Sequence, residues 1–265
     1  MNEKITSAQN SKIKRLIALT QKSAERRSQG VFVAEGQREI AHCLAAGLTI
    51  TTLYYCPALL GSDNPSARFT LPAATRCIEV SADLYDRMAY RGSTEGVIAE
   101  VVTPKRTLDD LHLKENALVV VLESVEKPGN LGAVLRSADA AGADAVIVCD
   151  PLTDLYNPNL IRASIGAIFT VPCVACTTSD CIAYLQNQGI RILTAQLQDS
   201  ALYYATDMRG STAIVMGTEA TGLTTAWRTA ADAHIRIPML GRLDSLNVSV
   251  SAAILLYEAV RQRQG

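Results

Sequence analysis

The chain from about residue 117 onward alternates uninterrupted apolar runs with stretches whose apolar residues recur every three or four positions. Runs such as LVVVL and AVIVC are typical of strands that are buried on both faces of a sheet. The periodic stretches between them predict helices. Strands are predicted at residues 117–123, 143–149, 167–175, 190–195, 212–216 and 233–237, and helices at 131–141, 179–188, 222–231 and 248–262. This order predicts a doubly wound α/β domain with a mainly parallel sheet.

The first hundred residues predict a smaller α/β unit. Residues 11–19 carry apolar side chains at helical spacing with lysines and an arginine between them, which indicates a basic amphipathic helix. Further strands are predicted at 30–34, 50–56 and 96–102, and helices at 36–47 and 81–88. A polar stretch around Pro104 follows. We therefore divide the chain into an N-terminal domain at 1–105, a linker at 106–116 and a C-terminal domain at 117–265.

Composition is that of an ordinary globular protein. The chain has 265 residues, of which 48% are hydrophobic and 19% are charged. Its apolar runs are all far shorter than the roughly 20 residues that span a bilayer. The first thirty residues carry charges throughout, which disfavours a signal peptide. We expect a cytoplasmic protein with no membrane partner.

Seven cysteines at irregular spacing fit reduced thiols better than a disulfide framework. Cys173 and Cys176 form one C-x-x-C pair, and Cys181 is nearby, but their segment FTVPCVAC predicts a strand. No second pair stands at the spacing of a zinc site. We interpret these cysteines as small buried hydrophobic residues and expect no metal ion.

The net charge of −1 conceals an asymmetry along the chain. Residues 1–106 carry 14 Lys and Arg against 10 Asp and Glu, whereas residues 107–265 carry 11 against 16. The positive charge is concentrated in six cations, which are Lys12, Lys14, Arg15, Lys22, Arg26 and Arg27. Cations this close together can neutralise several phosphates of a nucleic acid and release their counterions. The alternative is an ordinary solvated helix face, which the near-neutral charge of the whole chain favours.

Three segments that directly follow predicted strands carry the candidate chemistry, because ligands of such sheets bind at the carboxyl ends of the strands. The first, ESVEKPGNLGAVLRSADAAG, places Asn130 at a helix start and Arg136 one and a half turns later. Its glycines fit neither the G-x-G-x-x-G motif nor a P-loop, so an ordinary dinucleotide site is disfavoured. Taken alone, this segment is typical of a capped turn with an exposed arginine.

The second and third segments are also strand-to-helix connections. IVMGTEATGL ends a strand at Gly217 and carries Glu219 in the loop, and a glycine there permits close approach of a ligand to the backbone. Residues 236–263 place Ser245 and Asn247 just before a long helix, where either side chain can cap it. Taken alone, each segment also fits an ordinary turn or helix cap.

Together the segments resemble the three signature motifs of the SpoU/TrmH family of RNA ribose methyltransferases, which belongs to the SPOUT superfamily. The motifs N-x-G-x-x-x-R, G-x-E-x-x-G-[LIM] and I-P-M followed by S-L-N-V-S-V occur in this order. They are met by Asn130, Gly132 and Arg136, by Gly217, Glu219, Gly222 and Leu223, and by Ile237, Pro238, Met239 and residues 245–250. The run NPNLIRASIGAIFTVP at 157–172 also matches, and residues 1–105 more loosely resemble the family's substrate-binding domain. Thr218 and Ala220 depart from the Asn and Gly that are usual in the second motif.

The resemblance implies a C-terminal α/β domain that is tied in a deep trefoil knot and binds S-adenosylmethionine, with a smaller N-terminal α/β domain that binds RNA. Knots are rare exceptions to chain topology, so the apolar pattern itself does not predict one. The implied cofactor-binding positions are Thr194, Ala195, Gly217, Ile237, Met239 and Leu246.

The implied reaction moves a methyl group from a sulfonium to a ribose 2′-hydroxyl and requires no metal ion. The resemblance gives Arg136 the key catalytic role. Because a guanidinium does not readily lose its proton, our hypothesis is that Arg136 stays cationic and stabilises the charge that develops on the attacking oxygen. Asn130 would hold ribose or phosphate, and Glu219, Ser245 and Asn247 would orient the arginine and the loops.

The resemblance also implies a homodimer and an RNA partner. The helix at 248–262 would form part of the dimer contact, although ordinary core packing is an alternative for it. Ribosomal RNA is favoured over tRNA, because an extra N-terminal domain is typical of members that act on ribosomal RNA. RNA contacts are assigned to Lys12, Lys14, Arg15, Arg26, Arg27 and Arg162. Two alternatives stay open, a catalytically inactive RNA-binding relative and a nucleotide-linked α/β enzyme such as a dehydrogenase.

Overall fold

The computed structural model describes residues 3–90, 95–218 and 221–264. Contacts within the chain divide it into two compact units. The first unit comprises residues 1–105 together with 154–169, and the second comprises 106–153 together with 170–265. The segment 154–169 follows a strand of the predicted C-terminal domain in sequence, yet it makes its contacts with the N-terminal residues.

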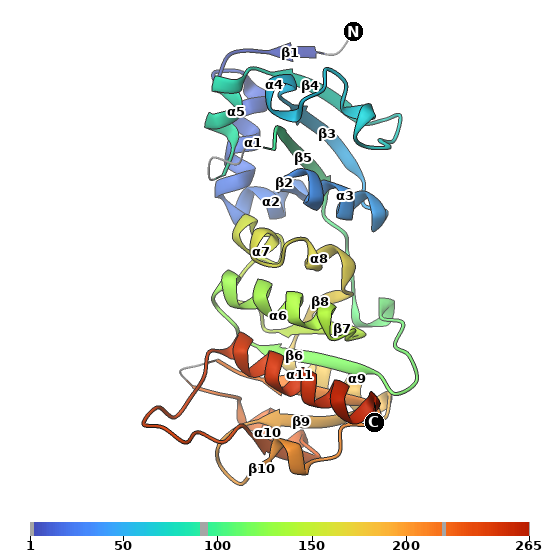
Figure 1. The fold of residues 1–265 in the computed structure, drawn as a ribbon, viewed down its shortest axis with the longest axis vertical. Coiled ribbons are helices and arrows are strands. Elements are labelled where there is room, and N and C mark those ends of the chain that lie inside the picture. The colour runs from blue at the N-terminus through green and yellow to red at the C-terminus, as the bar shows by residue number, and fades with distance from the viewer. Residues whose placement is uncertain (1–2, 91–94, 219–220, 265) are drawn as a thin grey trace. The chain divides into compact units, whose positions relative to one another are not determined.

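The first unit is built on a mixed sheet with the strand order β1-β4-β3-β5-β2 (Figure 1). Strand β4 is parallel to β1 and β3, whereas β5 is antiparallel to β3 and β2. The strands are β1 (Glu3–Ile5), β2 (Val31–Glu35), β3 (Ile50–Tyr55), β4 (Arg76–Val80) and β5 (Val97–Val102). The helices and 3-10 turns are α1 (Ser11–Gln21), α2 (Ser23–Gln29), α3 (Gln37–Ala45), α4 (Pro57–Leu60), η1 (Pro65–Ala67), α5 (Ala82–Met88), α7 (Pro158–Ala163) and α8 (Ala167–Thr170).

Helix α1 shows how the amphipathic pattern builds this unit. Asn10 caps the helix, because its side-chain oxygen accepts a hydrogen bond from the backbone N–H of Lys12 at 2.9 Å. Ile13, Leu16 and Leu19 lie on one face, are fully buried, and belong to the core cluster of this unit. The predicted basic amphipathic helix is therefore present, and its apolar stripe anchors it to the sheet.

The segment 154–169 is held to the first unit by aromatic stacking and a buried ion pair. The ring of Phe32 in β2 stacks on Tyr156 at 4.6 Å and on Phe169 at 5.6 Å between ring centroids. The Arg26 guanidinium donates to Asp154 at 2.6 Å, and both side chains are largely buried. These contacts explain why the segment belongs to the first unit and not to the unit whose strands flank it in sequence.

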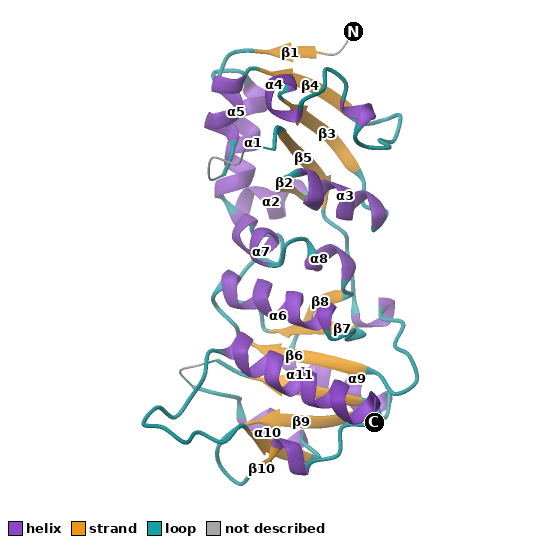
Figure 2. Ribbon diagram, in the orientation of Figure 1, coloured by secondary structure: helices purple, strands orange, loops and turns teal. Residues whose placement is uncertain are grey.

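The second unit is built on a parallel sheet (Figure 2). Within the described residues this sheet has seven strands in the order β10-β12-β9-β11-β6-β7-β8, and every neighbouring pair is parallel. The strands are β6 (Leu118–Glu123), β7 (Ala145–Cys149), β8 (Cys173–Cys176), β9 (Arg191–Ala195), β10 (Ala201–Leu202), β11 (Thr212–Met216) and β12 (Ala233–Arg236). The helices and 3-10 turns are η2 (Leu108–Asp110), α6 (Pro128–Ala140), α9 (Thr178–Asn187), η3 (Tyr203–Ala205), α10 (Thr225–Ala230) and α11 (Val248–Gln264).

Helices cover both faces of this sheet, which is the predicted doubly wound arrangement. One core cluster joins alternate strand residues such as Val119 and Val121 to Cys181 and Leu185 of α9 and to Trp227 of α10. The intervening strand residues point to the opposite face. There α6 packs beside α11, and these two helices contact β7 and β11 (Figure 1). Strands buried on both faces must be apolar throughout, which explains the uninterrupted runs in the sequence.

The predicted strand at 167–175 is wrong in its first half. Residues 167–170 form α8, and only Cys173–Cys176 forms a strand, β8. A continuous apolar run does not distinguish a buried helix from a buried strand, and Pro172 separates the two elements. Helix α7 was not predicted, although Asn157 caps it and Pro158 occupies its first turn, which are both standard start signals.

Neither unit has, within its described residues, a helix long and apolar enough to cross a membrane. All seven cysteines are free thiols. The trefoil knot stays a prediction.

Candidate functional site

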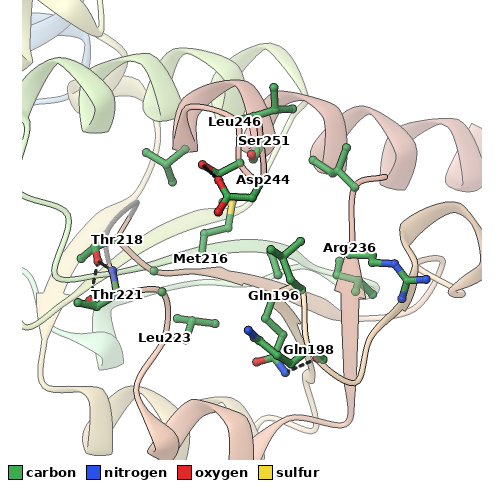
Figure 3. Close-up of a pocket in the computed structure, with 18 of the residues that line it drawn as sticks. Gln196, Gln198, Met216, Thr218, Thr221, Leu223, Arg236, Asp244, Leu246 and Ser251 are labelled. Carbon is green, nitrogen blue, oxygen red and sulfur yellow. Dashed lines mark hydrogen bonds between the residues drawn. The ribbon is translucent and has the colours of Figure 1, made fainter. Parts of the chain in front are cut away.

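A cavity of about 340 Å³ opens at the carboxyl ends of three neighbouring strands of the second unit, β9, β11 and β12. This is the sheet edge at which doubly wound domains bind their ligands, and the volume lies in the range of roughly 300–1,000 Å³ that small-molecule sites occupy. Figure 3 shows Met216 near the centre of the cavity, with Thr218 and Thr221 on one side and Gln196 and Gln198 on the other.

The cavity brings together most of the predicted cofactor-binding positions. Those that line it are Ala195, Gly217, Ile237, Met239 and Leu246. They come from three loops that are distant in sequence, one after each of the strands β9, β11 and β12. Thr194 does not line the cavity. It is fully buried one residue earlier in β9, where its hydroxyl makes a 2.6 Å hydrogen bond with Nδ1 of His234 on the adjacent strand.

The loop after β11 folds so tightly that only glycine fits at position 217. A Cβ added to Gly217 would lie 2.2 Å from the carbonyl oxygen of Gly222. The loop closes through a bond from the Gly222 N–H to the Thr218 carbonyl at 3.0 Å, and the Thr218 hydroxyl accepts from the Thr221 N–H at 3.0 Å. Thr218, which departs from the family's usual Asn, thus holds the turn with its hydroxyl, as Asn and Thr side chains both can. Glu219 and Ala220 lie outside the described residues.

The wall of the cavity also offers polar groups that the sequence did not single out. The side-chain Oε1 of Gln196 is buried and has no hydrogen-bond partner among the described residues. Asp244, Arg228 and Arg236 contribute one anionic and two cationic side chains to the lining. A buried acceptor without a partner is costly, so its presence at a cavity wall indicates a site built for a ligand that can donate to it.

The first and third motifs meet through a pair of asparagines. The Asn247 side chain donates from Nδ2 to Oδ1 of Asn130 at 3.1 Å. Its own Oδ1 caps α11 by accepting from the N–H of Ser249 at 3.0 Å and from the Ser249 hydroxyl. Ser245 lines the cavity, and its hydroxyl donates to Asp244 at 3.3 Å. Asn247 therefore joins the start of α6 to the start of α11.

Arg136 stands apart from these groups. It lies on α6 six residues beyond Asn130, is exposed, and does not line the cavity. Within the part of the chain that the structure describes, its guanidinium has no hydrogen-bond or ion-pair partner. Six residues on a helix correspond to about 600° of rotation, so the two side chains leave α6 in different directions. A single copy of the chain therefore does not bring Arg136 to the cavity wall.

Glu123 is a buried carboxylate at the end of β6 to which the sequence analysis gave no role. Its Oε2 accepts from the backbone N–H of Thr224 at 2.8 Å, and its Oε1 accepts from the hydroxyls of Thr224 and Thr178 at 2.7 and 3.1 Å. Thr224 ends the loop that begins at Gly217 and occupies the N-cap position of α10, but its hydroxyl donates to Glu123 and makes no capping bond. A charged residue that ends an otherwise apolar strand is the signal that could have identified this position.

The cations predicted to contact RNA lie in the first unit and differ widely in exposure. Lys14, Arg27 and Arg162 are exposed. Lys12 pairs with Glu3, and Arg15 pairs with Glu100, although both cationic side chains remain partly accessible.

Arg26 is the exception, because its side chain is only 3% exposed. Besides its ion pair with Asp154, it donates to the carbonyl oxygens of Leu19 and Thr20. Burial and these internal bonds disfavour the predicted RNA contact of Arg26. Burial of this cation was not visible from the sequence, in which Arg26 and Arg27 look equivalent.

The fold and the cavity define a parallel α/β domain with a small-molecule site beside a helix that starts at the first motif. Comparison with protein families sharpens this class. The model of the SpoU rRNA Methylase family matches residues 117–257, and that of the MRM3-like substrate binding domain matches residues 10–99. The chain belongs to the SpoU rRNA methylase family, and the recognition made from its three motifs is confirmed.

Relatives of the whole chain agree with this assignment. The chain is 30% identical to the 23S rRNA (guanosine(2553)-2′-O)-methyltransferase RlmP of Bacillus subtilis over 260 aligned residues. The alignment covers 96% of this chain and 98% of that protein. Among solved structures, an RNA 2′-O ribose methyltransferase is 40% identical to this chain and superposes on it with a TM-score of 0.83. The match covers 99% of this chain and 100% of the other. The AdoMet-bound rRNA methyltransferase of Sinorhizobium meliloti is 31% identical, covers 98% of this chain and 97% of its own, and has a TM-score of 0.89.

Proposed function

We propose that this protein methylates a ribose 2′-hydroxyl of ribosomal RNA with S-adenosylmethionine as methyl donor. The observation that carries the proposal is the cavity at the ends of β9, β11 and β12, where loops of the second and third motifs converge, beside the asparagine pair that links the first and third motifs. The RlmP relative is named as a 23S rRNA 2′-O-methyltransferase. One solved relative is named as an RNA 2′-O ribose methyltransferase and the other as an rRNA methyltransferase with AdoMet bound.

The residues of the cavity fit the proposed methyl donor. Gly217 lines the cavity, and its lack of a side chain lets the Gly222 backbone fold against it, which shapes this part of the wall. Ile237 and Leu246 offer apolar surface and backbone polar groups, which suit an adenine ring. The unpaired Oε1 of Gln196 would accept from an amino or hydroxyl group. Asp244 and Arg228 provide charges of both signs for an amino-acid moiety.

When bound, S-adenosylmethionine supplies a methyl group on a positively charged sulfur. The protein's task is then to align the attacking ribose oxygen and to stabilise the negative charge that develops on it. We assign this stabilisation to the guanidinium of Arg136, a planar cation that offers several N–H donors. Asn130 would position ribose or phosphate, and Asn247 and Ser245 would keep the loop and the helix start in place. Glu219 is assigned the same orienting role.

The position of Arg136 leads us to propose a homodimeric active site. Exposed apolar side chains gather on α11 and on the loop before it. They are Leu240, Leu243, Leu246, Val250 and Tyr257, with exposed fractions between 38% and 96%. Several large apolar side chains exposed on one helix and the loop before it favour a protein interface there. A second copy packed on this surface would bring its own α6, and therefore its own Arg136, toward the cavity of the first copy.

Mixed dimers test this arrangement directly. A Gly217→Ala chain has a damaged cavity and an intact arginine, whereas an Arg136→Ala chain has the reverse. If the arginine acts across the interface, refolding equal amounts of the two inactive chains restores about a quarter of the wild-type activity, because half of the dimers are mixed and one of their two sites is complete. If the arginine acts within its own chain, the mixture stays inactive and the two-chain site is wrong.

We assign the first unit to RNA binding, through Lys12, Lys14, Arg15, Arg27 and Arg162. Contacts with phosphates weaken as salt rises, because releasing counterions into a more concentrated salt solution gains less entropy. Replacing Lys14 and Arg27 with Gln should therefore raise the Kd for a ribosomal RNA fragment and flatten its salt dependence. The exposed acidic residue Asp83, changed to Asn, serves as the control. A cytoplasmic location follows from the proposed substrate.

The central experiment is an in vitro methylation assay on a ribosomal RNA fragment and on tRNA. Ribose methylation blocks alkaline cleavage at the modified nucleotide, so the position and the class of the product are read together. The proposal predicts one protected ribose in the ribosomal RNA and none in tRNA. Binding of either RNA without methylation would favour the inactive relative, and calorimetric binding of NAD instead of S-adenosylmethionine would favour the dehydrogenase alternative.

A further inference from the structure

Three cysteine sulfurs converge on the side of the sheet edge away from the proposed methyl-donor cavity. Cys149 ends β7, and Cys176 ends the neighbouring strand β8, where the two residues are direct partners in the register of the parallel pair. Cys181 lies in the first turn and a half of α9, which follows β8. The three sulfur atoms all lie within 4.8 Å of one another.

This spacing is that of a metal-binding thiol set. Zinc lies about 2.3 Å from each cysteine sulfur, so sulfurs around one tetrahedral ion are separated by roughly 3.8 Å. A triangle with sides under 4.8 Å reaches that geometry with small side-chain rotations. A disulfide would use two sulfurs and leave the third unexplained. The convergence of three thiols from three different elements is accounted for by one ion that binds them all.

The surroundings give such an ion both enclosure and access. Cys149 and Cys181 are fully buried in the core cluster shared by the sheet and α9. Cys176 is partly exposed and lines a second cavity of about 670 Å³, together with Thr177 and Asp180. Two ligands are thus sealed against water, while the third faces an opening through which an ion could enter.

The local electrostatics differ among the three thiols. Hydrogen bonds with Cys149 and Cys181 lower the pKa of the Cys176 thiol, whereas a hydrogen bond with Cys176 and burial raise the pKa values of Cys149 and Cys181. A bound metal ion would displace the remaining thiol protons. The nearby carboxylates are engaged locally. Asp180 accepts from the Thr177 hydroxyl at 2.7 Å, and Asp150 accepts from the N–H of Thr178 at 3.2 Å. Soft thiolates select ions such as Zn²⁺ and Cu⁺ over Mg²⁺ or Ca²⁺.

We propose that Cys149, Cys176 and Cys181 bind one thiophilic metal ion, which is Zn²⁺. The fourth coordination position of this ion faces the second cavity. The bound ion ties the ends of β7 and β8 to the start of α9. It takes no part in methyl transfer, so the site is independent of the proposed function. The sequence analysis missed it because Cys149 stands 24 positions before the C-x-x-C pair.

Cadmium titration of the reduced, chelator-treated full-length protein tests the site, because Cd²⁺ bound to thiolates absorbs in the ultraviolet. We expect the absorption to rise and saturate at one Cd²⁺ per chain. Cys176→Ser should abolish it. Cys77→Ser is the matched control, since Cys77 is also partly exposed but lies in the first unit, and it should leave the titration unchanged. Absorption that is absent, or equally strong in Cys176→Ser, would overturn the proposal.

A second measurement needs no substitution and therefore does not depend on the folding of a variant. The unaltered protein is alkylated with and without one equivalent of Zn²⁺, and the labelled cysteines are identified by peptide mass spectrometry. Zn²⁺ should protect Cys176 and leave the labelling of Cys77 unchanged. Equal labelling of Cys176 in both samples would show that the three thiols are ordinary core residues.

Discussion

Two parts of one sheet edge carry very different chemistry. Beyond β9, β11 and β12, the chain continues into loops that leave a cavity lined by apolar residues together with polar and charged side chains such as Gln196, Asp244 and Arg228. At the ends of β7 and β8, the sulfurs of Cys149 and Cys176 lie within 4.8 Å of each other and of the Cys181 sulfur, beside the second cavity. Because all of these strands are parallel, the same edge serves both sites, and the residues that end each strand decide what that part of the edge can bind.

Glu123 lies between the two sites and accepts hydrogen bonds from a residue next to each of them. It ends β6, the strand between β11 and β7 in the sheet. Its carboxylate binds Thr224, which closes the loop of the methyl-donor cavity, and Thr178, which starts the helix that carries Cys181. The comparison therefore predicts that some substitutions will affect one site only and that Glu123 will affect both.

The largest effect should come from Gly217→Ala. The added methyl group would collide with the backbone of Gly222, so the loop must open and the cavity must change shape. We expect the Kd for S-adenosylmethionine, measured by calorimetry, to rise at least about a hundredfold, which corresponds to about 2.8 kcal/mol. Gly210→Ala is the control, since its Cβ would meet nothing within 4 Å. The cadmium titration of the thiol cluster should be unaffected, and a normal Kd would contradict the role given to the loop.

Arg136→Ala should reduce catalysis without weakening the binding of S-adenosylmethionine. Arg136 does not line the cavity of its own chain, and removal of one group that stabilises developing charge costs about 10²–10³ in kcat. Single-turnover kinetics and calorimetry separate the two effects. Arg136→Lys keeps the charge but loses the planar fork of donors, so it should rescue only part of the rate. Retention of most of kcat/KM in Arg136→Lys would refute the need for a guanidinium.

Glu123→Gln should lower the stability of the whole second unit. In the wild type, Oε2 accepts from the N–H of Thr224, and Oε1 accepts from the hydroxyls of Thr224 and Thr178. In the variant, an NH₂ group that cannot accept replaces one of these two oxygens. At least one buried donor therefore loses its partner. The free energy of unfolding should fall by about 1–3 kcal/mol, measured by denaturant titration. Glu126→Gln, at an exposed position nearby, should change little. A stable Glu123→Gln variant would show that the two sites are not joined through this residue.

A smaller effect is expected on the pH dependence of the thermal stability. It involves a residue of neither site and should therefore not distinguish between them. Hydrogen bonds from Arg261, with a further one from Gln262, lower the pKa of the Glu258 carboxyl on α11 below its ordinary value of 4.5. A carboxyl whose pKa is lower in the folded state stabilises the protein above its unfolded pKa, and this contribution is lost as the pH falls through the folded pKa. Tm should therefore fall below pH 4.5, and the fall should be shallower in Glu258→Gln. Identical pH profiles of the two proteins would contradict this assignment.

Much of the fold could be predicted because its pattern is local. The apolar runs gave the strands of the parallel sheet, and the helical spacing of Ile13, Leu16 and Leu19 gave α1. The error at 167–175 arose where an apolar run fits a helix and a strand equally well. The motifs also identified the loops of the cavity, because Gly217 and Leu246 belong to short phrases with a fixed spacing.

The sequence by itself therefore determined the family, the alternation of strands and helices, and the loops that line the methyl-donor cavity, since each of these is written in residues close together along the chain. Only the tertiary structure decided that Arg26 is buried while Arg27 is exposed, that residues 154–169 pack with the first unit, and that Cys149 meets Cys176 and Cys181. These outcomes depend on contacts between segments that are distant in sequence, and such contacts exist only once the sheets have formed.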